Sequence, residues 1–420
     1  MRNDVATIIK FYKQLSMIKK ASFLLQGLSI LVLLASCGGS NQQASDASDS
    51  TGMETSSQAV RFKKHTLTND FISEGVAVGD VNHDGKIDVM AGAYWFQAPD
   101  WKRAEIFEGQ TFDGAKGYSN SFLNFSMDVN ADEWIDLIVI DFPGKVAHWY
   151  ENPRNEQGHW KKHLIHGTVE VGNESPAFVD IDGDGRFELL CADSKEKQMV
   201  WLKAPASGNG PWTKFTISEK NSPGTDRFSH GLGYGDVNKD GRKDVIIKQG
   251  WWEGPEDPTQ PSWKFHEANL GEDCSQMHVL DVNSDGLNDV VSASAHRYGI
   301  WWHEQVTEGN NSWRLHEISK AFSQSHSSSL TDLNKDGNVD LIVGKRFFAH
   351  NDTDNDPGAH DPAVLYWFEF TPGAAPFFTA HEIDNNSGSG LNIVAQDMTN
   401  DGNVDIAISN KKGVFVFERL

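Results

Sequence analysis

One nine-residue pattern, D-x-[DN]-x-D-G-x-x-D, occurs seven times along this chain of 420 residues, with small departures. Self-similarity at a period of about fifty residues is typical of proteins that stack copies of one supersecondary unit. The chain is therefore expected to contain seven equivalent units. The copies begin at Asp80, Asp128, Asp180, Asp236, Asp281, Asp332 and Asp397, so successive copies are 48, 52, 56, 45, 51 and 65 residues apart.

These nine-residue segments, called aspartate loops below, have the composition of calcium-binding loops. Oxygen side chains at positions 1, 3, 5 and 9 surround a Gly at position 6, and Ca²⁺ prefers such hard oxygen ligands. An EF-hand closes with an acid at position 12 on a helix, whereas here the acid at position 9 leads into apolar runs such as Val245-Ile246-Ile247, so each loop is expected between two strands. The predicted ligands are Asp80, Asn82, Asp84, Asp88, Asp128, Asn130, Asp132, Asp136, Asp180, Asp182, Asp184, Glu188, Asp236, Asn238, Asp240, Asp244, Asp281, Asn283, Asp285, Asp289, Asp332, Asn334, Asp336, Asp340, Asp397, Asp401 and Asp405.

Two aspartate loops depart from the pattern. Glu133 occupies the Gly position of the second loop, where a positive φ is strained for a residue with a side chain. Thr399 replaces the carboxylate or amide at position 3 of the seventh loop. These two loops are expected to bind calcium most weakly. A solvated Asp/Asn/Gly turn would explain one such segment but not seven with the same spacing.

The first sixty residues differ from the rest. Lys19 and Lys20 precede an apolar run, 21–34, that ends in Leu-Ala-Ser-Cys37-Gly. This resembles a bacterial lipoprotein signal, and the resemblance implies that residues 1–36 are removed, that Cys37 is lipidated and that Met17 is an alternative start. The run is short for a transmembrane helix. Residues 37–59 are polar and predict a flexible tether, with residues 60–420 as the folded domain. The expected location is the periplasm, outer membrane or cell surface, with membrane contact through the lipid anchor only.

The net charge of −22 is concentrated in the aspartate loops, which hold 22 carboxylates at ligand positions. No stripe rich in Lys or Arg is present, which argues against a nucleic acid partner. Besides Cys37 the chain has only Cys191 and Cys274, and their spacing indicates neither a disulfide nor a metal knuckle. Cys191 is expected to pack in the core.

Each unit contains four short apolar or aromatic segments, which predicts an all-β fold, a seven-bladed propeller of four-stranded blades. In the sixth unit the expected strands are 327–333, 339–344, 364–370 and 377–383. A strand at 61–68 precedes the first loop, and the chain ends after a third-type strand at 413–418. The N-terminal strand should therefore complete the last blade and remove an exposed sheet edge. The chain is expected to be a monomer.

The expected fourth strands share the sequence pattern W-x-x-H or F-x-x-H. Equivalent positions in a propeller lie far apart around the ring, so these histidines predict a structural role and not a common catalytic site. They are His65, His163, His266, His316 and His381.

The units G-D-V-N-x-D-G-x-x-D, followed downstream by Trp149-Tyr-Glu-Asn-Pro153, resemble FG-GAP/VCBS repeats over about residues 60–420. Trp-rich third strands, as at Trp251-Trp252, together with the W-x-x-H fourth strands, are most similar to the propeller of aldos-2-ulose dehydratases and, more distantly, to propeller polysaccharide lyases. That resemblance implies β-elimination of water or an alcohol from a sugar. The cupin domains of the dehydratase/isomerases are absent from this sequence, so no isomerase step is expected.

The face opposite the aspartate loops is expected to hold the functional site, in a central funnel formed by the segments before the first strands and between the second and third strands. Elimination needs a base to remove the proton α to a carboxylate or ketone, for which His326 or His230 is predicted. It needs a proton donor for the departing oxygen, for which Tyr298 or the other histidine is predicted. A cation must stabilise the enolate; the candidates are Arg297, Arg346, Lys248 and Lys345. Further substrate-binding candidates are Glu74, Glu174, Lys248, Gln276, His278, His296, Lys345 and His350.

An insertion at 350–361 lengthens the sixth unit on this face. One interpretation is a solvated acidic loop. The other is a lid or a second metal site that uses His350, His360 and one or more Asp, since long loops in compact domains are usually functional or mobile.

Two function classes follow from the sequence. The first is a lyase or dehydratase acting outside the cytoplasm on an acidic or oxidised oligosaccharide that contains a uronic acid or keto sugar. The alternative is a non-catalytic, calcium-dependent propeller that binds a glycan or a protein at the cell surface. The expected cofactors are several structural Ca²⁺ ions and, as an additional hypothesis, a divalent metal at the funnel.

Overall fold

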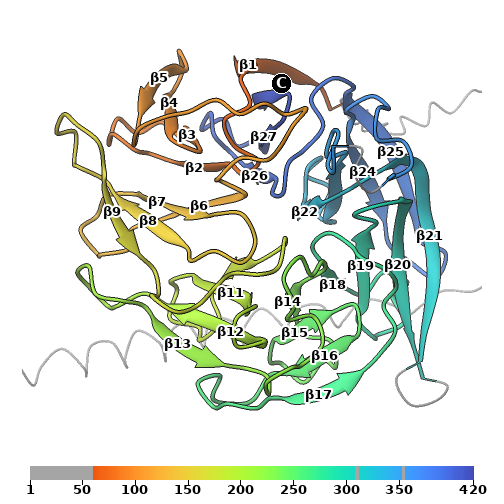
Figure 1. The fold of residues 1–420 in the computed structure, drawn as a ribbon. Helices are drawn as coiled ribbons and strands as arrows, with labels where there is room; N and C mark the ends of the chain where they lie inside the picture. Colours follow the sequence, from red (N-terminus) through yellow and green to blue (C-terminus); the bar gives the residue numbers. More distant parts are fainter. Residues whose placement is uncertain (1–59, 308–311, 352–354) are drawn as a thin grey trace, which may run out of the picture. The chain divides into compact units, whose positions relative to one another are not determined.

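The computed structural model describes residues 60–307, 312–351 and 355–420. The predictions for residues 1–36 and 37–59, including lipidation of Cys37, lie outside this part. Within it the chain forms seven four-stranded antiparallel sheets arranged in a ring (Figure 1), which confirms the predicted seven-bladed β-propeller. No helix of the described residues is long and apolar enough to cross a membrane.

The first strand of each blade lies nearest the centre of the ring and the fourth lies at the outside (Figure 1). Blade 1 contains β2 (Ala77–Gly79), β3 (Asp88–Ala91), β4 (Tyr94–Gln97) and β5 (Lys102–Glu105). Blade 2 contains β6 (Leu123–Met127), β7 (Asp136–Ile140), β8 (His148–Glu151) and β9 (Lys161–Leu164). Blade 3 contains β10 (Ala177–Val179), β11 (Glu188–Asp193), β12 (Gln198–Lys203) and β13 (Thr213–Thr216). Blade 4 contains β14 (Gly233–Gly235), β15 (Asp244–Ile247), β16 (Gly250–Glu253) and β17 (Lys264–Glu267).

Blade 5 contains β18 (His278–Leu280), β19 (Asp289–Ala293), β20 (Tyr298–Val306) and β21 (Ser312–Ser323). Blade 6 contains β22 (Ser327–Thr331), β23 (Asp340–Gly344), β24 (Leu365–Thr371) and β25 (Phe377–Asp384), within two residues of the predicted bounds. Blade 7 contains β26 (Val394–Gln396), β27 (Asp405–Asn410) and β28 (Gly413–Arg419), and it is completed by β1 (Phe62–Thr68).

The ring closes as the sequence predicts, because β1 pairs with β28 in antiparallel register. The pairing runs from Phe62 opposite Arg419 to Thr68 opposite Val414. The Nζ atom of Lys63 also lies 3.0 Å from the Glu418 carboxylate. The two ends of the folded chain therefore share one sheet, and this sheet has no free edge at its third strand.

The core lies between the blades. Trp149 of β8 is fully buried in one cluster with Leu189 and Val200 from blade 3, and the second strands are buried along their whole length because both their faces are covered. Cys191 belongs to the same cluster, so its predicted packing role is confirmed. The aromatic third strands thus supply the contact between neighbouring blades.

The fourth-strand histidines are structural, as predicted. In four blades the imidazole stacks on a third-strand tryptophan, with ring centroids 4.1 to 4.3 Å apart. In these blades and in blade 7, the Nε2 of the histidine lies 2.6 to 3.0 Å from a glutamate carboxylate. This glutamate follows, by two residues along the third strand, the residue that is paired with the histidine. These paired imidazoles are held on the outer strands of the blades, far from the centre of the ring (Figure 1).

Each aspartate loop joins a first strand to a second strand. In the fourth loop the carboxylate of Asp244 is buried and accepts the backbone N–H of Val237 at 2.7 Å and that of Gly254 at 2.9 Å. The acid at position 9 therefore connects its own loop to the end of the third strand. Glu133, in the second loop, has a φ of 74°, which confirms the strained conformation expected at the Gly position.

Candidate functional site

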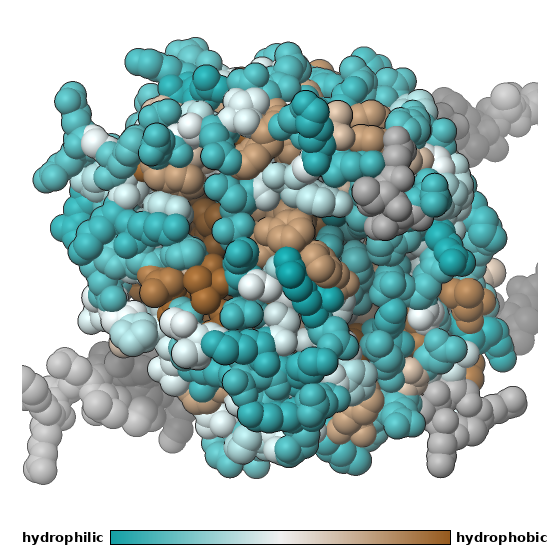
Figure 2. All heavy atoms as spheres, viewed as in Figure 1, coloured by the Kyte–Doolittle hydropathy of each residue, from teal (hydrophilic) through white to brown (hydrophobic). Residues whose placement is uncertain are grey.

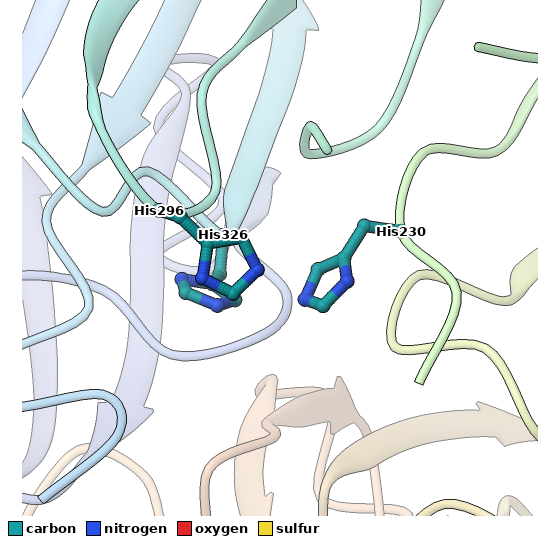
Figure 3. A group of neighbouring side chains, drawn as sticks. All are labelled: His230, His296 and His326. Carbon is teal, nitrogen blue, oxygen red and sulfur yellow. The ribbon is translucent and has the colours of Figure 1, made fainter. Parts of the chain in front are cut away.

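Three histidines meet on the face opposite the aspartate loops (Figure 3). His230 precedes β14, His296 lies between β19 and β20, and His326 precedes β22. One ring nitrogen of each lies within 4.8 Å of one from each of the others. The ring centroids are 4.7 Å apart for His230 and His296 and 5.5 to 5.6 Å for the two pairs with His326. We call these residues the histidine cluster. His230, His296 and His326 are all among the residues predicted for the site, and the structure brings them together.

Neighbouring groups fix the orientation of these rings. The Nδ1 of His326 lies 3.4 Å from the carbonyl oxygen of Gln324, and the Nδ1 of His296 lies 3.4 Å from the Asp356 carboxylate. Asp356 is also 2.5 Å from the Nδ1 of His350, whose ring stacks on His296 at 4.7 Å. Burial lowers the pKa of His326 well below its usual value. Among the described residues, the buried Nε2 of His326 has no hydrogen-bond partner, and that of His230 has the Glu174 carboxylate at 3.6 Å, just beyond hydrogen-bond distance.

A buried ion triad lies beside the histidine cluster. Arg346 donates to Glu74 at 2.7 Å and to Glu174 at 3.1 Å, and its guanidinium lies over the ring of Phe122 at 5.4 Å. Burial would raise the pKa of Glu174, but His230, at 3.6 Å, and Arg346 together lower it to about 2. Two carboxylates share one guanidinium, so the triad carries one uncompensated negative charge.

The cluster opens into a cavity of about 340 Å³. One side of this funnel cavity is aromatic and the other is polar. In the view of Figure 2, hydrophobic atoms gather near the centre of the ring, while hydrophilic atoms cover most of the remaining surface. The aromatic lining residues are Tyr118, Phe122, Phe142 and Phe228, and the polar ones are Glu174, His230, Asp273, His296 and His350.

Other residues predicted for the site lie around the cavity and not in its lining. Lys248 pairs with Asp273 at 2.5 Å, and the exposed guanidinium of Arg297 is 3.9 Å from Glu272. Tyr298 donates its hydroxyl to Asp361 at 2.8 Å. Each of these side chains therefore has an acidic partner that it would have to leave in order to reach a ligand in the cavity.

Lys345, Gln276 and His278 lie in other surroundings. Lys345 is buried and donates to the carbonyl oxygen of Gly358 at 2.5 Å, and burial lowers its pKa to about 8. Gln276 and His278 line a different hollow, of about 520 Å³, between the first strands at the centre of the ring. There the Nε2 of His278 lies 2.9 Å from the hydroxyl of Ser328, and burial lowers the pKa of His278 to about 4.

The insertion of the sixth unit divides between the site and its surroundings. His350 and Asp356 contact His296 of the histidine cluster, whereas the ring of His360 packs on Phe348 at 5.0 Å. Residues 352–354, which include two of the predicted acidic groups, lie outside the described part. The sequence analysis missed Tyr118, Phe142, Phe228 and Asp273. Position along the chain could have indicated Phe228, which lies two residues before His230.

The aspartate loops have a donor set that fits Ca²⁺. In the fourth loop Asp236 accepts the backbone N–H groups of Asp240 and Gly241 at 3.1 and 2.9 Å, which gathers the oxygens of positions 1, 3 and 5 on one side. Burial, followed by repulsion from the other acids of its loop, raises the pKa of Asp88 to about 7. A bound dication would reverse both effects, because it stabilises the ionised carboxylate.

The third loop differs from the others. Lys203, at the end of β12, pairs with Asp182 and lies 2.5 Å from Asp184. The equivalent residue in the other blades is a glutamine or a glutamate. Blade 3 also has Asp182 where five loops have asparagine, and it has Phe215, which stacks on Trp201, where five blades have a histidine. The ammonium group of Lys203 therefore neutralises carboxylates that are predicted to bind calcium.

Comparison with known proteins identifies the repeat. The sequence matches the family model of the FG-GAP-like repeat at residues 128–191, 180–247 and 281–343. Comparison with curated proteins finds no match. The fold is similar to that of a lectin from Agrocybe aegerita that recognises non-reducing terminal N-acetylglucosamine, with 13% identity, a TM-score of 0.45, and coverage of 84% of this chain and 87% of the lectin chain. It is also similar to the V. cholerae biofilm matrix protein Bap1, with 12% identity, a TM-score of 0.43, and coverage of 86% and 91%.

The family match begins at the second aspartate loop and includes the third, fourth, fifth and sixth loops, each of which joins the first two strands of a blade. The sheet topology shows that the chain is a seven-bladed β-propeller, and the match shows that residues 128–247 and 281–343 of it are FG-GAP-like repeats.

Proposed function

We propose that the funnel cavity binds a carbohydrate that carries a carboxylate or keto group and catalyses β-elimination on it. The observation that carries this proposal is the division of the cavity into an aromatic wall and a wall of imidazole and carboxylate groups. Small-molecule sites typically combine apolar surface with a few placed polar groups. A sugar ring offers an apolar face to Tyr118, Phe142 or Phe228 and a polar edge to the histidines.

His350 is the proposed base. It lines the cavity, and its contact with Asp356 holds the ring in one orientation, as a carboxylate does for the histidine of hydrolase triads. His326, predicted as a base from the sequence, is 2% exposed and does not line the cavity. His230 does line it but belongs to the histidine cluster, whose nitrogens face one another.

The elimination involves two proton transfers, one from the sugar to the base and one from an acid to the departing oxygen. The base removes the proton α to the carboxylate or ketone, the electron pair of that C–H bond forms the carbon–carbon double bond, and the β C–O bond breaks. The departing oxygen takes a proton from a neutral O–H group, for which Tyr118 in the cavity lining is the candidate.

Arg346 is not suited to stabilise the enolate intermediate. Both of its arms are bound by Glu74 and Glu174, so the buried triad offers no excess positive charge to a ligand. Enolate charge must therefore be stabilised by another cation. This arrangement also favours a second candidate function, the binding of a neutral or acidic glycan without turnover, for which the aromatic wall is sufficient.

The test is an assay with oligosaccharides that contain uronic acid or keto sugars. The wild-type chain is expected to produce a conjugated alkene, seen as a rise in ultraviolet absorbance. His350→Gln is expected to lower kcat by about 10²- to 10⁴-fold, the usual contribution of a general base. His360→Gln is the matched control, since this histidine lies in the same insertion but outside the cavity lining.

Full turnover by His350→Gln would reject the base assignment. If the wild-type chain binds these oligosaccharides in calorimetry and forms no alkene, the cavity is a glycan-binding site and the elimination is rejected. Failure to bind any of them would reject both functions.

We also propose that Ca²⁺ stabilises the aspartate loops and that Lys203 takes over part of this role in the third loop, because its ammonium group contacts both Asp182 and Asp184. Lys203→Met is expected to lower the melting temperature in a calcium chelator, since Asp182, Asp184 and Glu188 then lack a cation. Added Ca²⁺ should raise the melting temperature of this variant more than that of the wild type, because ligand binding to the native state stabilises it.

Lys86→Met is the control for this prediction. Lys86 lies 3.7 Å from Asp84 in the first loop and is half exposed, so its loss should change the calcium response little. Equal calcium-induced shifts in Lys203→Met and the wild type would contradict the role given to Lys203.

A further inference from the structure

We propose that the hollow between the first strands is a second binding site and that it takes one ring of an uncharged sugar. This hollow, called the central hollow below, has a volume of about 520 Å³ and is lined by residues from every blade except blade 4. Such a volume lies within the range of about 300 to 1,000 Å³ that is typical of small-molecule sites. The inference does not depend on the chemistry proposed for the funnel cavity.

The mouth of the central hollow lies on the face of the aspartate loops. Val179 and Gln396, which line it, are the last residues before the third and seventh loops, and Phe187 belongs to the third loop itself. Phe187 is 49% exposed. None of the described residues that line the funnel cavity also lines the central hollow. The two spaces are therefore separate sites on opposite faces of the ring.

Side-chain amides form the inner end of the central hollow. Gln276 donates to the carbonyl oxygen of Leu391 at 3.1 Å and accepts the N–H of Ser328 at 2.8 Å, so it connects segments of blades 5, 6 and 7. Asn392 donates to the carbonyl oxygen of Val76 at 2.7 Å and connects blade 7 to blade 1. These bridges across the centre of the ring give the hollow a polar floor.

The lining carries no formal charge. No Asp, Glu, Lys or Arg of the described chain lines the central hollow. His278 in its wall is neutral, because burial lowers its pKa to about 4. A carboxylate or ammonium group that entered would lose its hydration without gaining an ion partner, which is costly. An uncharged ligand is therefore favoured here, in contrast to the funnel cavity with its imidazoles and carboxylates.

Two side chains of the lining have unused hydrogen-bonding capacity. Asn124 is 0% exposed; its Oδ1 accepts the hydroxyl of Ser121 at 2.9 Å and the N–H of Gly92 at 3.4 Å, whereas its Nδ2 has no partner among the described residues. The Nε2 of His278 lies 2.9 Å from the hydroxyl of Ser328, and its Nδ1 forms no hydrogen bond within the described part of the chain. Buried polar groups are nearly always paired. Sugar hydroxyls both donate and accept, so they would pair with the amide donor and with either tautomer of the imidazole.

Aromatic rings supply the apolar side of the central hollow. Phe125 and Phe178 stack with their centroids 5.1 Å apart, and Phe187 meets Phe178 edge-on at 5.7 Å. All three line the hollow. A pyranose ring has an apolar C–H face and a hydroxyl edge, so it matches these phenyl rings on one side and the amides on the other. A wholly apolar ligand would leave the amides and the imidazole unpaired.

The test is a calorimetric titration of the full chain with three uncharged probes, the methyl glycosides of glucose, galactose and mannose. We expect at least one of them to bind, because the hollow offers both hydrogen-bonding groups and an aromatic surface to a neutral ring. Failure of all three to bind would overturn the proposal.

Phe187→Ala is expected to weaken this binding by about 2- to 10-fold, the contribution of one aromatic contact. Because Phe187 is exposed, the variant should fold. Phe377→Ala is the matched control, since Phe377 is also exposed, at 56%, but lies on the outer strand β25. Wild-type affinity in Phe187→Ala would mean that the sugar is not held at this mouth and would reject the site.

His278→Phe keeps an aromatic ring in the wall and removes both nitrogens. It is expected to weaken binding by about 2- to 10-fold, the contribution of one hydrogen bond. His148→Phe is the control: this imidazole is also half-buried, with its pKa lowered to about 4, but it lies on β8 and lines neither space. A loss of affinity in His148→Phe as large as that in His278→Phe would reject the role given to His278.

Binding in the funnel cavity is distinguished by a variant of its own wall. A loss of glycoside binding in Phe228→Ala, with full binding in Phe187→Ala, would place the sugar in the funnel cavity and reject the central hollow. Alkene formation from uronates is expected to be the same in Phe187→Ala as in the wild type. A failed elimination assay and a failed glycoside titration are therefore independent results.

Discussion

Deletion of residues 61–68 is expected to make the propeller aggregate or lose cooperative unfolding. These residues include β1, which covers the edge of β28 through an unbroken run of cross-strand pairs apart from one irregularity near Thr68. The uncovered strand would present Val414, Phe415, Val416 and Phe417, all buried in the intact ring. An exposed, apolar strand edge pairs readily with other chains.

Size-exclusion chromatography and thermal unfolding would measure this effect. Deletion of residues 38–58, which precede the propeller in the sequence, is the control and is expected to change neither the elution nor the cooperativity. A monomeric product of the first deletion with an unchanged transition would mean that the β1–β28 pairing does not hold the ring closed.

Arg346→Met is expected to lower the free energy of unfolding by about 3 to 5 kcal/mol, the usual cost of removing one partner from a buried ion pair. The reason is that Glu74 and Glu174, which are 0% and 6% exposed, would both lose the cation that compensates their buried charge. Denaturant unfolding would measure the loss. Arg103→Met is the matched control: Arg103 pairs with Asp70 at 3.2 Å but both are exposed, and such pairs contribute at most about 1 kcal/mol.

A combined variant separates charge from packing. Arg346→Met together with Glu74→Gln and Glu174→Gln removes all three charges, so it should recover much of the stability lost by the single variant. If the single variant is as stable as Arg103→Met, the triad is not the buried, uncompensated system described above. If the combined variant is no more stable than the single one, the cost comes from the lost packing of the guanidinium on Phe122.

The blades could be predicted from the sequence because each depends on short-range patterns. An aspartate loop folds through hydrogen bonds within nine residues, as between Asp236 and the N–H of Gly241. A strand needs only the apolar alternation of its own residues. The structural role of His163 could be predicted because the same W-x-x-H pattern occurs in other blades. Repetition also showed which of the four strands in a blade each segment forms. Because the chain begins with a fourth-type strand and ends with a third-type strand, closure by β1 could be predicted.

The site was predictable only in part. The offset from each loop placed His230, His326, Glu74 and Glu174 on the correct face, since every unit has the same geometry. The offset did not determine the direction in which each side chain points or the residues that it contacts. Gln276 lies one residue from a cluster-equivalent position, yet its side chain enters the central hollow, where it bonds the backbone N–H of Ser328. One step along a strand reverses the side of the chain on which a residue lies.

The sequence by itself determined the repeat, the number of blades and the ring closure, because these follow from local pairing rules applied seven times. Only the tertiary structure decided the electrostatics of the funnel. Arg346 meets a glutamate 272 residues away, His296 meets an aspartate 60 residues away, and Lys203 enters a loop that its composition alone marks as a calcium site. Such contacts depend on which side chains the closed ring brings within a few ångströms, and in a buried site those distances decide whether a charge is compensated or available to a ligand.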